Sequence, residues 1–133
     1  MSKEKEDKDA QTLLELRDKL EMNGAYLAMV QNQQRRTGVN LRRAQLTLDE
    51  VQALPESVAM YKAVGKAYFL APKAELVSEL SGDVKAGQDQ AAELERQQER
   101  AVKAIKAIEG EVAEVARGNP GAQQAFRRLM GGA

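Results

Sequence analysis

The stretch VAMYKAVGKAYFLAP, residues Val58–Pro72, decides how the rest of the chain is arranged. Its β-branched and aromatic residues, interrupted by Gly65-Lys66, predict two short strands at Ala59–Ala63 and Ala67–Leu70 that form a β-hairpin. A two-stranded hairpin alone is marginally stable in water, because its outer edges keep unpaired backbone groups. We therefore expect the hairpin to complete its sheet with strands of other chains and to act as an assembly element.

Long helix-forming segments flank the hairpin. In residues 11–46 and 73–117, apolar and small residues recur at alternating spacings of three and four, which is typical of the core seam of a coiled coil. The first seam comprises Leu13, Leu16, Leu20, Asn23, Leu27, Val30, Gln34, Thr37, Leu41 and Ala44. The second comprises Val77, Leu80, Val84, Gly87, Ala91, Leu94, Gln98, Ala101, Ile105, Ile108, Val112 and Val115.

The remaining segments complete a mainly α fold. Residues 1–10 are charged, have no apolar face and are predicted to be disordered. Residues 47–72 hold a short helix, for which Thr47 and Glu50 have capping-box spacing, followed by the hairpin. Residues 118–133 begin with Gly-Asn-Pro, a strong helix stop, and are predicted to be a flexible tail with at most one amphipathic turn around Phe126, Leu129 and Met130. The fold class is therefore a long antiparallel coiled-coil hairpin of two helices, joined through a short helix and one β-hairpin.

The register of the coiled coil follows from the polar residues of its seams. If facing residue numbers add to 121, Asn23 lies opposite Gln98 and Gln34 lies opposite Gly87. A shift by one heptad buries both amides against apolar residues, and an unpaired buried amide costs about 1–3 kcal/mol. We therefore expect the register of 121.

This register has a consequence at the ends of the helices. It places Val112 opposite Asp9 and Val115 opposite Glu6, so the second helix carries apolar residues past the last apolar residue of the first. An uncovered apolar patch on a polar protein usually marks a binding surface. The tips of the coiled coil are therefore a predicted binding site.

A resemblance to a known family rests on the hairpin and the residues around it. The stretch Leu46–Leu80, LTLDEVQALPESVAMYKAVGKAYFLAPKAELVSEL, resembles β-type prefoldin subunits, with their Y-x-x-V-G-x-x-F/Y-x-L-x-x-K hairpin running into the second helix. Its most specific part is Met60–Lys73. The chain departs from the family at Ala71, where a serine often caps the second helix.

The resemblance implies a subunit of a heterohexamer of α-type and β-type prefoldin subunits. In that family the hairpins build a double β-barrel, and the coiled-coil tips hold non-native actin and tubulin for the cytosolic group II chaperonin without ATP. The hairpin residues implied in assembly are Met60, Tyr61, Val64, Gly65, Tyr68, Phe69 and Leu70. The candidate client-binding residues at the tips are Leu13, Leu16, Ile105, Ile108, Val112 and Val115. From the residues alone, a scaffolding coiled coil that self-associates through the hairpin remains the alternative.

Composition argues against other classes of function. The 133 residues include 20 basic and 20 acidic side chains, so no net charge attracts nucleic acid or an anionic membrane. Histidine and cysteine are absent, which removes the usual general bases, nucleophiles and metal ligands. We expect no catalytic site, cofactor or metal. With no membrane span or secretory signal in the sequence, we expect a soluble cytoplasmic protein.

Two local features have alternative readings. The basic group Arg35, Arg36, Arg42 and Arg43 is read as a solvated helix face rather than a phosphate site, because no aromatic residues interleave with it. Tyr61 and Phe69 are read as sheet residues rather than as the lining of a ligand pocket.

Overall fold

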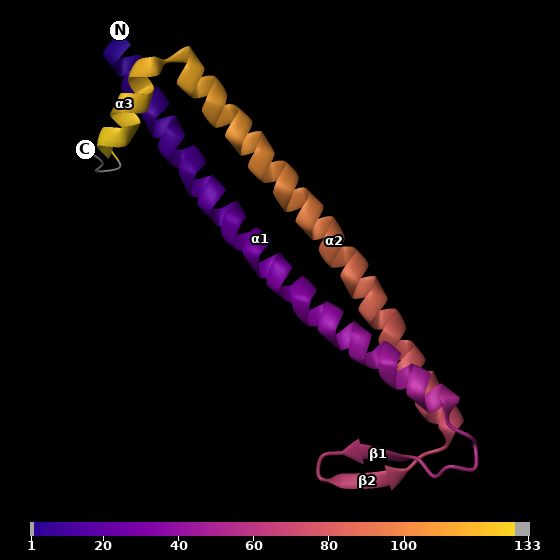
Figure 1. The fold of residues 1–133 in the computed structure, drawn as a ribbon. Helices are drawn as coiled ribbons and strands as arrows, with labels where there is room; N and C mark the ends of the chain where they lie inside the picture. The colour runs from indigo at the N-terminus through magenta and orange to yellow at the C-terminus, as the bar shows by residue number, and fades with distance from the viewer. Residues whose placement is uncertain (1, 130–133) are drawn as a thin grey trace. The chain divides into compact units, whose positions relative to one another are not determined.

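The computed structural model describes residues 2–129, and it has two long helices separated by a β-hairpin (Figure 1). In chain order the elements are α1 (Ser2–Ala53), β1 (Tyr61–Val64), β2 (Ala67–Leu70), α2 (Lys73–Gly118) and α3 (Pro120–Leu129). The predicted fold class is therefore confirmed. The chain divides into two compact units, which are described separately below. The terminal unit comprises Met1–Gln31 with Gln97–Ala133, and the hairpin unit comprises Asn32–Arg96.

Helix α1 is longer at both ends than the sequence pattern indicated. It begins at Ser2, within the stretch expected to be disordered, because lysine and glutamate favour helices and Ala10 is buried against the rest of the unit. It also continues through Thr47, where a new helix was expected. The Thr47 hydroxyl donates to the carbonyl oxygen of Arg43 at 2.8 Å, so it bonds within α1 and does not cap a new helix. Residue 1 lies outside the described residues.

The predicted flexible tail contains a third helix. Asn119 follows α2, and its side-chain Oδ1 accepts a hydrogen bond from the backbone N–H of Ala122 at 3.3 Å, as an N-cap residue does. Pro120 then occupies the first position of α3, where its missing N–H is not needed. The predicted stop at Gly118-Asn119-Pro120 is thus a turn between two helices. Residues 130–133, including Met130, lie outside the described residues.

The hairpin is close to its predicted position. Strands β1 and β2 are antiparallel, with Tyr61 paired to Leu70 and Val64 paired to Ala67. Gly65 adopts a φ of 62°, a left-handed conformation that glycine takes without strain and that lets the two strands join in a tight turn. The first strand begins at Tyr61 rather than at Ala59.

Both predicted helix seams are confirmed in their choice of residues. Each seam residue of α1 and α2 is buried or half-buried, whereas most residues between them are exposed. The spacing of the seam residues therefore identifies which side of each helix faces its neighbour.

The predicted register is wrong by one heptad in the hairpin unit. A Cβ atom built on Gly87 would lie 3.0 Å from Cδ1 and 3.4 Å from Cβ of Leu41, so these two residues face each other and their numbers add to 128. The expected register instead placed Gln34 opposite Gly87 and Leu41 opposite Leu80. Glycine at position 87 lets the Leu41 side chain approach the backbone of α2 closely.

The terminal unit has the same corrected register. Val112 lines one cavity with Leu13 and Leu20, which places it opposite the intervening turn of α1 rather than opposite Asp9. Beyond α2, the Asn119 side chain donates to the Asp9 carboxylate at 3.1 Å, again with numbers that add to 128. A shift of one heptad along a helix is about 10 Å, so the two registers are clearly distinct.

The cause of the wrong register is the amide of Asn23. It was expected to need Gln98 as a partner across the coiled coil. Instead the Asn23 amide donates to the carbonyl oxygen of Lys19 within α1 at 2.8 Å. An amide that is satisfied by its own helix carries no penalty opposite an apolar residue, so the argument that favoured 121 does not apply.

Candidate functional site

The hairpin presents apolar side chains to solvent on one face. Cross-strand pairing puts Tyr61, Tyr68 and Leu70 on the same side of the two strands. These side chains are 62%, 73% and 68% exposed, respectively. Exposure of large apolar residues side by side is unusual on a protein surface and marks an interaction surface.

The other face of the hairpin faces helix α2 through one ion pair. Lys62, Val64 and Phe69 share this face, and the Lys62 ammonium lies 2.7 Å from the Glu79 carboxylate. The hydrogen bond to Glu79 raises the pKa of Lys62 above its ordinary value of 10.5, so the ammonium stays charged. Val64 and Phe69 remain more than half exposed. Neither face of the hairpin is therefore covered within the unit.

The edges of the hairpin are also open. The described residues form a two-stranded sheet, so β1 and β2 each have one side without a hydrogen-bonded neighbour. Such edges pair with strands of other chains when their side chains allow it. Apolar faces and free edges together are the features of an incomplete sheet.

A lysine at the start of α2 fixes the chain before the hairpin. The Lys73 ammonium donates to the backbone carbonyl oxygens of Gln52 at 3.0 Å and Leu54 at 2.8 Å. The last turn of α1 has no basic residue of its own, so Lys73 supplies the positive charge that the carbonyl end of a helix favours. Sequence analysis included Lys73 in the hairpin motif but not this role, which depends on a contact 19–21 residues away.

The structure sorts the predicted assembly residues into three groups. Tyr61, Val64, Tyr68, Phe69 and Leu70 are exposed and available to another chain. Gly65 forms the turn. Met60 is only 8% exposed, and its carbonyl oxygen accepts from the N–H of Ala71 at 3.0 Å to close the base of the hairpin. Met60 therefore stabilises the hairpin unit itself.

The predicted tip residues lie together in the terminal unit, but they are covered. Leu13, Leu16 and Ile108 are buried. Ile105, Val112 and Val115 are half-buried. The expected uncovered overhang is therefore wrong, because the observed register gives α2 apolar partners on α1 and because α3 packs against the same end.

A cavity of about 330 Å³ lies among these three helices. It is lined by Leu13, Arg17, Leu20, Val112, Ala116, Gln123, Phe126 and Arg127. Most of these side chains are apolar or contribute an apolar stem, so the cavity suits an apolar group. Helix α3 was not expected to be part of this site, because the sequence predicted a flexible tail with at most one amphipathic turn around Phe126.

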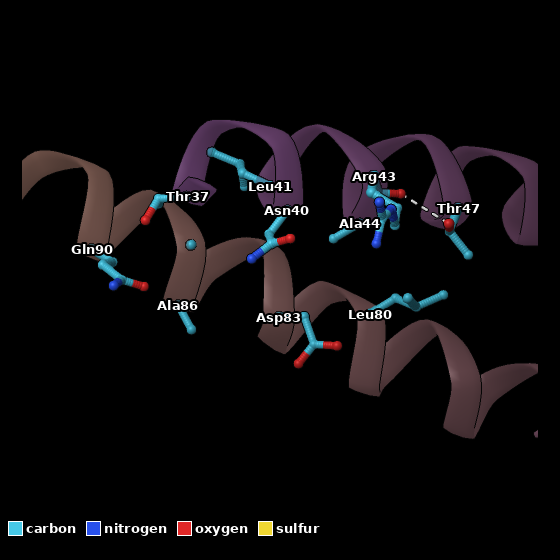
Figure 2. A pocket seen from close by; sticks show the side chains of 11 residues that line it. Thr37, Asn40, Leu41, Arg43, Ala44, Thr47, Leu80, Asp83, Ala86 and Gln90 are labelled. Carbon is cyan, nitrogen blue, oxygen red and sulfur yellow. Dashed lines mark hydrogen bonds between the residues drawn. The ribbon is translucent and has the colours of Figure 1, made fainter. Parts of the chain in front are cut away.

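The hairpin unit contains a second, more polar cavity of about 460 Å³ between facing segments of α1 and α2 (Figure 2). Its polar side chains include Thr37, Asn40, Arg43, Asp83 and Gln90. Asp83 supplies its one carboxylate, so the lining lacks the pair of acids that general acid–base chemistry uses. In residues 2–129, no three acidic side chains gather into a metal-binding group.

None of the helices in the described part of the chain has an apolar segment that could cross a membrane.

The arginines of the basic group, Arg35, Arg36, Arg42 and Arg43, are exposed on α1. Among the described surfaces, the candidate functional sites are thus the exposed hairpin and the ends of α1 and α2 that α3 covers.

Comparisons with known proteins agree with this geometry. A family model described as "Prefoldin subunit" matches residues 16–119. Prefoldin subunit 1 of Arabidopsis thaliana is 34% identical over 112 residues, which are 84% of this chain and 87% of the relative. The crystal structure of the prefoldin beta subunit from Thermococcus strain KS-1 superposes with a TM-score of 0.72 over 81% of this chain and 92% of the other, at 24% identity.

Proposed function

The chain belongs to the prefoldin subunit family, and we propose that it acts as a β-type subunit of a prefoldin heterohexamer that holds non-native polypeptides. Membership of this chaperone family supports association with other prefoldin subunits. The hexameric stoichiometry, the clients and the chaperonin are parts of the proposal.

The exposed hairpin is the observation that carries the proposal. Tyr61, Tyr68 and Leu70 form an apolar face that nothing in the hairpin unit covers, next to two free strand edges. Strand addition by other subunits would pair those edges through the backbone and bury the side chains. Burial of each large side chain contributes about 1.5–3 kcal/mol, so a shared sheet is strongly favoured.

The terminal unit supports a role in client binding. Its apolar residues lie at the ends of α1 and α2 and line a cavity with α3. We propose that this end contacts apolar segments of unfolded actin and tubulin, which are then passed to the cytosolic group II chaperonin. The subunit works without ATP, cofactor or metal, and it acts in the cytoplasm.

Reconstitution tests the assembly part of this proposal. The purified chain is mixed with the other prefoldin subunits, and the products are sized by light scattering after gel filtration. We expect one hetero-assembly that contains this chain and that prevents the aggregation of denatured actin. A chain that forms a defined homo-oligomer and ignores the other subunits would instead support the scaffolding function.

A further inference from the structure

Helix α3 covers the end of the α1–α2 pair in the terminal unit. Figure 1 shows it, in yellow, beside the N-terminal part of α1. Ala122 and Ala125 are 0% and 4% exposed, and Phe126 lines the apolar cavity together with Leu13 and Val112. The helix therefore occupies the surface that the proposed function assigns to clients.

One residue, Asn119, holds the start of α3 by two hydrogen bonds, and the buried Ala122 and Ala125 add packing contacts along the helix. Asn119 caps α3 through its Oδ1, which accepts from the N–H of Ala122 at 3.3 Å. The Nδ2 of the same side chain donates to the Asp9 carboxylate of α1 at 3.1 Å. Loss of this single amide would remove both the cap and the link to α1.

Helix α3 also has little stability of its own. It has ten residues, whereas isolated helices of fewer than about 12–15 residues are marginal in water. Its two buried side chains are alanines, which bury little apolar surface. The helix is thus formed largely because it is docked, and undocking is coupled to unfolding.

The groove under α3 is incompletely filled. The cavity of about 330 Å³ remains beside Phe126 with α3 in place. From α3 the cavity is lined by Gln123, Phe126 and Arg127, which follow the i, i+3, i+4 spacing of one helix face, whereas the buried Ala122 and Ala125 are not among its lining residues. A segment with the same spacing and larger apolar side chains would make more contacts in the same groove.

We infer that α3 is a built-in, displaceable occupant of this groove, and that a short apolar helix-forming segment of a non-native polypeptide replaces it. The inference rests on the proposed function and adds a means of control. With α3 docked, the groove accepts weak ligands poorly; a client segment that fills the cavity displaces α3, which unfolds.

Three forms of the full assembly test the inference, each reconstituted with the other prefoldin subunits. The open form ends at Asn119, and the loosened form carries Asn119→Ala. The closed form carries Gln11→Cys and Arg128→Cys, two residues of α1 and α3 that line one cavity, joined by a short bismaleimide before reconstitution, which is specific because the chain has no cysteine of its own. Gln124→Ala, on the exposed side of α3, is the matched control.

The probe is a fluorescent peptide with the sequence of residues 119–129 in which Gln123 and Arg127, which line the cavity, are replaced by leucine. We expect its affinity to fall in the order open, loosened, parent and closed, with at least tenfold between open and closed, as measured by fluorescence anisotropy. The Gln124→Ala control should match the parent. Equal affinity for all forms, or weakest binding to the open form, would overturn the inference.

Aggregation of denatured actin separates the inference from the proposed function. One altered subunit in six changes the concentration needed for half-suppression by about twofold, because the other subunits still bind. If the peptide affinities follow the expected order but no form suppresses aggregation, displacement of α3 from the groove is supported and the client-binding role is rejected. If every form suppresses aggregation equally and the peptide binds all forms with the same affinity, the client-binding role is supported and displacement of α3 is rejected.

Discussion

In the terminal unit, Leu13, Leu16 and Ile108 are buried, and α3 adds Ala122 and Ala125 to the same apolar cluster. In the hairpin unit, by contrast, Tyr61, Tyr68, Phe69 and Leu70 are all more than half exposed. The first unit covers the apolar residues of this cluster with its own chain, although Met22 and Met29 of α1 are exposed. The second leaves its apolar residues to be covered by other chains.

The two units therefore need partners for different reasons. On its own, the hairpin unit has exposed strands, and Met60 and Ala71 are the buried residues beside them. Under the proposed function, the terminal unit binds its partner reversibly and α3 covers its apolar residues in between. The proposal thus assigns stable assembly to the hairpin unit and reversible binding to the terminal unit.

A charge on the hairpin should have the largest effect. Tyr61→Asp and Phe69→Lys each place a charge on a different face of the hairpin, and the second charge lies directly opposite that of Lys62. Burial of an unpaired charge in a shared sheet costs several kcal/mol, so we expect incorporation into the hexamer to be lost. The helical circular dichroism of the isolated chain should be unchanged, because both side chains are exposed there.

Lys66→Asp is the matched control, since Lys66 lies in the turn between the strands rather than on either face. It should assemble as the parent does. If only one of the two charged variants fails, the face that carries it is the one that contacts other subunits. Normal assembly of both would remove the hairpin as the assembly element.

Truncation of a buried residue in the terminal unit should have the next largest effect. Leu16→Ala removes a side chain that is 5% exposed, and such changes cost about 2–5 kcal/mol of stability. We expect a clear fall in the thermal midpoint of the isolated chain, followed by circular dichroism. Met22→Ala, at a position that is 73% exposed on the same helix, should change stability by less than about 0.5 kcal/mol. Equal effects would mean that this unit has no self-contained core.

The sequence identified the hairpin and both helix seams because each depends on local periodicity. Alternation and a Gly-Lys turn predict strands, and spacing of three and four predicts the buried face of a helix. These patterns can be identified without knowing which other segments the strands and helices contact. For the same reason they could not distinguish two registers that differ by a heptad.

The misplaced features depended on contacts that a helix spacing does not show. The choice of register turned on the hydrogen bond of Asn23, which it makes to Lys19 within its own helix. Helix α3 was missed because ten residues that begin with proline and glycine have weak intrinsic helicity. The helix is stabilised by burial of Ala122 and Ala125 and by the bond from Asn119 to Asp9, which lies 110 residues earlier in the chain.

Loss of the lysine that fixes the end of α1 should have a moderate effect. Lys73→Met keeps the apolar stem but removes the hydrogen bonds to the carbonyl oxygens of Gln52 and Leu54. We expect a loss of about 1 kcal/mol, since the contacts are partly exposed to solvent. Hydrogen exchange should accelerate in the last turn of α1, with little change in the terminal unit. Lys66→Met, which removes a lysine from the turn, should leave that exchange unchanged.

The smallest effect concerns the helix seam of the hairpin unit, and it tests the register directly. Gly82→Ala and Gly87→Ala both remove a glycine from α2, which favours the helix by up to about 1 kcal/mol. A Cβ at Gly82 would meet nothing within 4 Å, so we expect the full gain there. At Gly87 the new atom would lie 3.0 Å from Cδ1 of Leu41, so we expect little gain or a small loss. Chemical denaturation of the isolated chain would measure the difference.

A double-mutant cycle shows which residue faces Gly87. Leu41→Ala removes the crowding atoms, so Gly87→Ala should then recover its gain, with a coupling of about 0.5–1 kcal/mol between the two changes. Gln34→Ala should show no such coupling, because the observed register places Gln34 one heptad away from Gly87. In the register of 121 the roles are reversed, and Gly87 would couple to Gln34 alone. The identity of the coupled residue therefore distinguishes two alignments that have the same seam residues and the same helix boundaries.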